Sequence, residues 1–158
     1  MRYFVLSTAL AMVLMSTAYA QTTESCTPSP DDRSENQTEK LLKNLLKSKN
    51  FSAVENELNA RLKRYVEGRY SDLSLLILID KTATAADPSL EPILQQWVAE
   101  RPNQLMARLV KASYHIDAGY ARRGTSYIAA TSVEQLSAMK ADFDKASVDA
   151  EVALNINP

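Results

Sequence analysis

Apolar residues recur along this chain at the three- and four-residue spacing of amphipathic helices, beginning near residue 38. Thr38 is placed to cap a first helix, and the apolar face of that helix is formed by Leu41, Leu42, Leu45 and Leu46. After a turn at Lys49-Asn50, Ser52 and Glu55 have the spacing of a capping box for a second helix. The apolar face of the second helix consists of Val54, Leu58, Leu62, Tyr65 and Val66. The pattern predicts a tight helical hairpin that ends near Gly68.

The next segment, residues 70–79, fits two kinds of structure. Residues 75–79 are continuously apolar, which suits a buried helix and a buried strand equally well. A single strand among helices would lack a pairing partner, so we expect a helix that is packed on both sides.

Two more helices are indicated further along the chain. Pro92 falls in the first turn of one of them, where proline is tolerated, and its apolar stripe is Ile93, Leu94, Trp97 and Val98. The next spans residues 104–120, with one face made of Leu105, Leu109, Ala112, Ile116 and Gly119. Small residues at Ala112 and Gly119 permit the close approach of another helix. With only three glycines in the chain and no sustained period-two alternation, the fold class is predicted to be all-α, with about six helices.

The last thirteen residues carry a repeat signature, in which small residues and a final proline stand at Ala146, Ala150, Ala153 and Pro158. This spacing is typical of the second helix of a tetratricopeptide-type hairpin. The first helix of that unit would be the one at residues 104–120, which lies about 20 residues too far away for a 34-residue repeat. The excess is residues 122–133, interpreted as an insert over one face of the hairpin, together with extra helix at residues 134–145. We therefore expect a modified tetratricopeptide-like array.

The N-terminus has the pattern of an export signal. A basic start at Arg2 precedes an apolar run over residues 3–15, and residues 16–20 end in an Ala-x-Ala cleavage site after Ala20. The alternative is an uncleaved anchor, although the run is short for a membrane span of about 20 residues. Residues 21–37 are polar and predict a disordered linker. The remaining residues, 38–158, would form one helical domain in the periplasm or outside the cell.

Cysteine content and net charge narrow the functional classes. Cys26 is the single cysteine and stands too far from the cleavage site to be lipidated, so it is either a free thiol or joins two molecules. The chain has 18 basic and 19 acidic residues, a formal charge of −1. A balance so close to neutral gives no electrostatic reason to expect nucleic acid or anionic lipid as a partner.

Chemistry-bearing residues are few. His115 is the single histidine, interpreted as lying at the surface or at the edge of the core, and no catalytic or phosphate-binding motif is present. We therefore expect no enzyme activity, no metal and no cofactor. The best binding candidate is the cluster of Tyr120, Arg122, Arg123 and Tyr127, where guanidinium groups beside aromatic rings could hold a carboxylate or a glycan. In the alternative interpretation, Arg122 or Arg123 caps the C-terminus of its helix and the tyrosines fill the groove under the insert.

The chain resembles a bacterial family known as domain of unknown function 4034 (DUF4034). The resemblance rests on Trp97-Val98-Ala99, Pro102-Asn103, Ala107-Arg108, the stretch 121–127 and the alanine-spaced tail. Tyr120 departs from the pattern, in which a tryptophan is expected. The resemblance implies a tetratricopeptide-like fold in exported or envelope proteins, with no assigned activity. It also implies that other members continue into more helical repeats, so that this chain would be a short or truncated one.

Taken together, the sequence favours an exported, non-enzymatic helical-repeat protein that binds a protein or peptide in the bacterial envelope. The alternative is a ligand-binding or enzymatic accessory domain associated with the cell wall. A homo-oligomer is a further expectation, formed through Cys26 or through an open C-terminal repeat face that a second copy covers.

Overall fold

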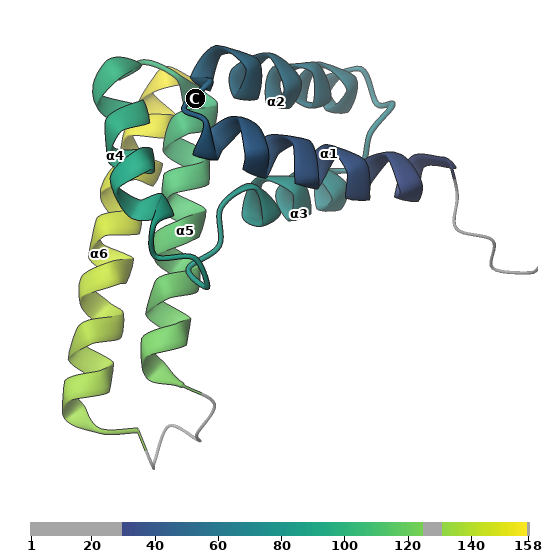
Figure 1. Cartoon of the computed structure of the whole chain (residues 1–158). Helices are drawn as coiled ribbons and strands as arrows, with labels where there is room; N and C mark the ends of the chain where they lie inside the picture. The colour runs from purple at the N-terminus through teal and green to yellow at the C-terminus, as the bar shows by residue number, and fades with distance from the viewer. Residues whose placement is uncertain (1–29, 125–130, 158) are drawn as a thin grey trace, which may run out of the picture.

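The computed structural model describes residues 30–124 and 131–157, which contain six α-helices and no strand (Figure 1). The helices are α1 (Pro30–Lys47), α2 (Phe51–Val66), α3 (Asp72–Thr82), α4 (Leu90–Glu100), α5 (Leu105–Arg123) and α6 (Val133–Ile156). The all-α fold class is thereby confirmed. The signal sequence, residues 21–29 of the linker, Cys26 and Tyr127 lie outside the described residues.

The first hairpin joins α1 and α2, as the apolar spacing predicted, and Gly68 follows the end of α2 with a φ of 69°, as expected, but the N-terminal caps differ from those expected. Helix α1 already begins at Pro30, so Thr38 lies inside it, where its Oγ1 accepts a hydrogen bond of 2.9 Å from Arg61. Lys49 in the turn has a φ of 57°, and Asn50 caps α2 by accepting a hydrogen bond from the backbone N–H of Ala53. The predicted capping box is therefore wrong, and its glutamate, Glu55, is buried instead.

The core is centred on Trp97 of α4, whose side chain has no exposed surface. Its ring stacks on that of Phe51, with the ring centres 5.7 Å apart and the planes 8° from parallel. Its indole N–H donates to Glu55 Oε1 over 2.8 Å, and Glu55 Oε2 lies 3.4 Å from the guanidinium of Arg101. Because Phe51 and Glu55 both belong to α2, this one side chain fixes α4 against the first hairpin.

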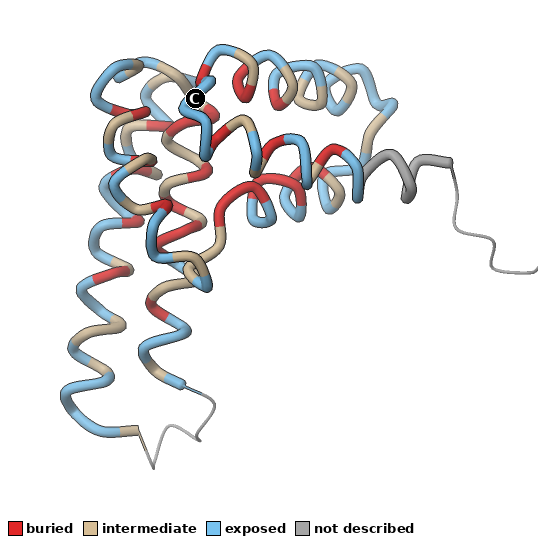
Figure 2. The backbone as a smooth tube through the Cα atoms, viewed as in Figure 1, coloured by how far each residue is buried: buried red, intermediate tan, exposed pale blue. Residues whose placement is uncertain are grey.

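Helix α3 confirms the helical alternative for residues 70–79, but the expectation that it packs on both sides is wrong. One side of the helix is buried (Figure 2). This core face carries Leu75, Leu78 and Ile79. The opposite side exposes 64% of Leu73, 62% of Leu76 and 48% of Ile77. The continuous apolar run therefore covers two faces of a helix, and only one of them has a partner among the described residues.

Helices α5 and α6 form the second hairpin, and their connected ends extend beyond the other helices (Figure 1). A capping box of Ser132 and Gln135 starts α6, which packs chiefly on α5. The predicted close approach occurs at Gly119, where an added Cβ would lie 2.6 Å from Cε1 of Phe143. The insert expected at residues 122–133 forms no separate layer over the hairpin in its described parts, residues 122–124 and 131–133. They belong to the C-terminal end of α5 and the N-terminal end of α6, so the extra residues lengthen the hairpin.

The hydrogen bond from Trp97 to Glu55 can be tested by substitution. Glu55→Ala leaves the buried indole N–H without an acceptor, which we expect to lower the free energy of unfolding by about 2 kcal/mol. Glu55→Gln keeps an acceptor oxygen and removes the charge, so it is the matched control and should cost clearly less. Urea denaturation followed by tryptophan fluorescence measures both. Equal losses for the two variants would contradict this role of the hydrogen bond.

Candidate functional site

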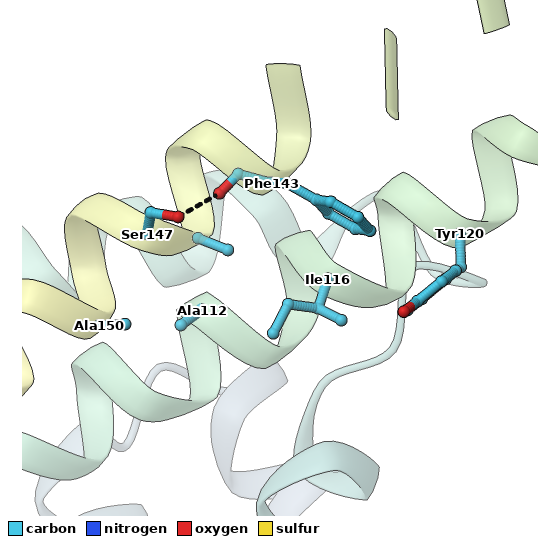
Figure 3. Close-up of a pocket in the computed structure, with 7 residues that line it drawn as sticks. Ala112, Ile116, Tyr120, Phe143, Ser147 and Ala150 are labelled. Carbon is cyan, nitrogen blue, oxygen red and sulfur yellow. Dashed lines mark hydrogen bonds between the residues drawn. The ribbon is translucent and has the colours of Figure 1, made fainter. Parts of the chain in front are cut away.

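A groove runs along the side of the α5–α6 hairpin that no other described helix covers. It has a volume of about 330 Å³ and is lined by Ala112, Ile116, Tyr120, Phe143, Ala146, Ser147 and Ala150 (Figure 3). The alanines keep the two helices close together. Two larger side chains remain open to solvent, since Ile116 is 45% and Tyr120 54% exposed.

The groove follows from the spacing of its residues on each helix. On α5, Ala112, Ile116 and Tyr120 recur every four residues and so share one side of the helix. At the Tyr120 end, the tyrosine ring packs edge-on against Phe143 of α6, with 5.3 Å between the ring centres. The hydroxyl of Ser147 donates to the backbone oxygen of Phe143 over 3.0 Å. The groove is therefore mainly apolar in what it offers to a ligand, with the hydroxyls of Tyr120 and Ser147 as its polar groups.

The described residues of the predicted cluster, Tyr120, Arg122 and Arg123, lie on two different sides of α5. Tyr120 lines the groove, and Arg123 lies three residues later on the same side of α5. The Nε of Arg123 is buried and has no hydrogen-bond partner in the described part of the chain. Arg122 points to the other side of the hairpin, where its Nε donates to the carboxylate of Asp142. The two guanidinium groups therefore do not form one site, and Arg122 binds a side chain on α6 rather than capping α5.

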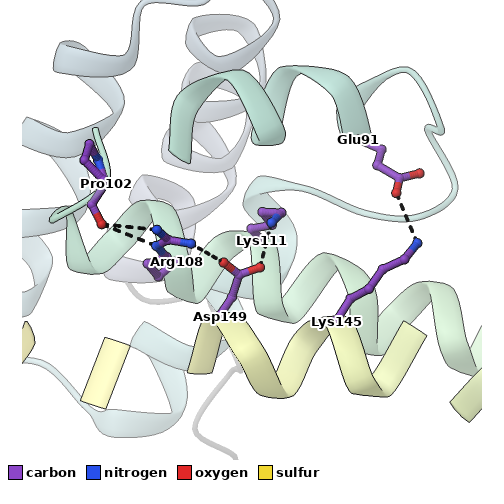
Figure 4. A network of polar contacts seen from close by, with 6 residues as sticks. All are labelled: Glu91, Pro102, Arg108, Lys111, Lys145 and Asp149. Atoms are coloured by element: carbon purple, nitrogen blue, oxygen red, sulfur yellow. Dashed lines mark hydrogen bonds and ion pairs between the residues drawn. The ribbon is translucent and has the colours of Figure 1, made fainter. Parts of the chain in front are cut away.

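The other side of the hairpin holds a buried polar seam, which we define as Asp142 and Asp149 of α6 with their cationic partners. Asp149 is 1% exposed and receives Arg108 at 2.7 Å on one oxygen and Lys111 at 2.8 Å on the other (Figure 4). The guanidinium of Arg108 also lies 3.4 Å from the backbone oxygen of Pro102. One buried carboxylate thus ties α6 to two turns of α5.

The second carboxylate of the polar seam, Asp142, is 2% exposed and is held by Arg122 and Lys145. Burial alone would raise its pKa. The hydrogen bonds from the two cations outweigh that effect, and the pKa of Asp142 is lowered below its usual value. Lys145 also lies 3.5 Å from Glu91, which joins α6 to α4. Sequence analysis missed this role, although two aspartates seven residues apart share one side of a helix.

His115 lies in the same region and is 2% exposed, so the expectation that it is at the surface is wrong, whereas its position outside the main hydrophobic core agrees with the expected edge of the core. Its Nδ1 has no hydrogen-bond partner within the described ranges. Burial lowers the pKa of His115, and the neighbouring charges of Lys145 and Lys111 lower it further. The imidazole is therefore neutral at physiological pH.

These contacts separate a structural region from a binding region. The carboxylates of the polar seam are satisfied by their own cations. Within residues 30–124 and 131–157, no three His, Cys, Asp or Glu side chains are grouped to hold a metal ion. In the same ranges, no helix combines the length and apolar character needed to cross a membrane. The groove combines exposed apolar side chains with a concave lining, so it is the candidate functional site.

Comparisons of the chain with protein-family models, with curated proteins and with solved structures gave no match. Membership of the DUF4034 family stays a prediction.

The structural role of the polar seam can be tested with two aspartates of α6. Asp149→Asn leaves Arg108 and Lys111 with no carboxylate, and we expect the free energy of unfolding to fall by about 3 kcal/mol. The control, Asp144→Asn, removes an exposed carboxylate that pairs with Lys140 within α6, and should cost less than about 0.5 kcal/mol. Chemical denaturation compares the two. A similar small loss in both variants would show that the polar seam does not hold the hairpin.

His115 predicts a pH dependence of stability. The folded protein protonates His115 less readily than the unfolded chain, in which the pKa is near 6.5. The stabilisation is complete above that value and is lost as the pH falls below it, with a slope of at most about 1.4 kcal/mol per pH unit. In His115→Gln this slope should vanish between about pH 7 and about pH 5. Urea midpoints across that range measure it. An unchanged slope in the variant would contradict the prediction.

Proposed function

We propose that this chain is an exported, non-enzymatic helical protein whose α5–α6 groove binds an apolar segment of another polypeptide. The observation that carries the proposal is the groove itself, where Ile116 and Tyr120 stay exposed beside a floor of alanines. Exposed apolar surface that is concave and continuous is typical of protein interaction sites.

The chemistry of the lining favours a polypeptide over a small polar ligand. Sites for small molecules combine an apolar pocket with a few polar groups that orient the ligand. In this groove the polar groups are the hydroxyls of Ser147 and Tyr120, and that of Ser147 already donates to the backbone of its own helix. A shallow apolar trough between two helices instead suits the apolar face of a third helix.

The export signal predicted at residues 1–20 supports the proposal that this binding takes place in the periplasm or outside the cell. The cell-wall alternative relied on Arg122 and Arg123 acting together on a carboxylate or glycan. Because Arg122 is engaged by Asp142 on the far side of the hairpin, the two guanidinium groups do not act on one ligand, and the mainly apolar lining favours a polypeptide.

A groove-filling substitution tests the proposal. Ser147 is exposed and lies in the lining, so Ser147→Trp places a bulky ring in the groove without entering the core. Ser137→Trp, at an exposed position of α6 away from the groove, is the matched control. Peptides selected from a display library of amphipathic sequences should bind the parent chain and Ser137→Trp. They should bind Ser147→Trp at least about tenfold more weakly. Selection of no peptide, or equal binding by all three proteins, would contradict the proposal.

A further inference from the structure

A second apolar surface stands out on α3, and we call it the α3 ridge: Leu73, Leu76 and Ile77. The three side chains are 64%, 62% and 48% exposed, and their spacing puts them side by side along one face of the helix. The ridge is flanked at its two ends by Asp72 and Asp80. A helix face of this kind has the shape and chemistry of a segment that enters an apolar groove.

The α3 ridge ends at the edge of the α5–α6 groove. Ser113 of α5 donates a hydrogen bond of 3.1 Å to Asp80, the residue that follows Ile77 by one turn. Ser113 in turn precedes Ile116 of the groove by three residues, so the two lie on neighbouring parts of α5. The hydrogen bond holds α3 beside the groove and keeps its ridge out of the groove of its own chain. The C-terminal end of the ridge and the groove therefore lie on neighbouring parts of the surface.

From these observations we infer that the occupant of the groove is a second copy of this chain, which inserts its α3 ridge. The inference rests on the proposed function and names the partner. Because each copy carries both surfaces next to each other, a two-fold axis allows the ridge of each to enter the groove of the other. Such an interface is closed and self-complementary, as in most homodimers.

A second copy explains more of the exposed apolar surface than an unrelated partner does. A foreign helix in the groove would leave Leu73, Leu76 and Ile77 in water. The reciprocal dimer covers both surfaces at once, and burial of apolar area is the main favourable term in such association.

Charges at the two surfaces are also complementary. Arg123 lies on the groove side of α5 beside Tyr120, and the structure gives it no ion pair within the described ranges. Asp72 at the start of the α3 ridge has no ion pair there either, and one of its oxygens accepts from the backbone of Leu73. Contact between Arg123 of one copy and Asp72 of the other would set the register of the dimer.

Sedimentation equilibrium of the purified chain tests the inference, with a reducing agent present so that no disulfide through Cys26 contributes. We expect a dimer for the parent chain and for Ser137→Trp. We expect monomers for Leu76→Lys, which spoils the α3 ridge, and for Ser147→Trp, which fills the groove. Both changes are at exposed positions, and circular dichroism should show unchanged helix content.

Mixing the two monomeric variants gives the sharpest result. The Leu76→Lys chain keeps an intact groove and the Ser147→Trp chain keeps an intact ridge, so the mixture should form a heterodimer through one of the two contacts. Arg123→Glu should raise the dimer dissociation constant by about tenfold, and adding Asp72→Arg to the same chain should restore it.

Three results would overturn the inference: a monomeric parent chain, a dimer unaffected by Leu76→Lys, or no heterodimer in the mixture. If the parent chain is monomeric while selected peptides still bind in a manner sensitive to Ser147→Trp, the proposed function stands and only the second copy is excluded. If the peptides and the dimer are both indifferent to Ser147→Trp, the groove itself is not a binding site.

Discussion

The complete burial of Trp97 is the constraint on which the arrangement of the helices depends. An indole in the core must find an acceptor for its N–H, and the acceptor here is the carboxylate of Glu55 on α2. A buried carboxylate needs a positive charge nearby, which Arg101 supplies from just beyond the end of α4. These linked requirements lock α4 onto the first hairpin. Since α5 packs against α4 and α3, they also set the direction in which the second hairpin projects.

The two sides of the α5–α6 hairpin differ in chemistry: one side is polar and buried, and the other is apolar and exposed. On one side, Asp142 and Asp149 draw cations from α5 and fix how α6 is rotated about its axis. That rotation turns Phe143, Ser147 and Ala150 to the other side, where the groove lies. The two carboxylates on one side are buried and paired, whereas Ile116 and Tyr120 on the other side are exposed. The polar side of the hairpin thus holds the two helices together, and the apolar side is left open to solvent.

Apolar spacing predicted the helices because each helix buries one face of apolar side chains. The three- and four-residue spacing of that face can be read directly from the sequence. The spacing could not tell which apolar face of α3 would find a partner, since burial of Leu75 and exposure of Leu76 depend on helices distant in sequence. The sequence near Glu55 was misleading for a similar reason. Its spacing from Ser52 suits a helix cap, but the carboxylate accepts a hydrogen bond from Trp97, which is distant in sequence. The division between Arg122 and Arg123 could have been foreseen, because residues 100° apart on a helix face different neighbours. The small residues of the last helix do pack, since Ala146 and Ala153 are both buried.

The near-contact of Gly119 and Phe143 couples two positions on different helices. The edge of the Phe143 ring occupies the position that a side chain at residue 119 would need. The backbone oxygen of Met139 lies on another side of the same position. A larger residue at position 119 is thus compatible with the same hairpin only if position 143 shrinks. In diverged proteins that share this hairpin, the two sites should co-vary, with the exposed groove widening or narrowing as they do. Such paired change would identify a distant relative where overall sequence similarity has faded.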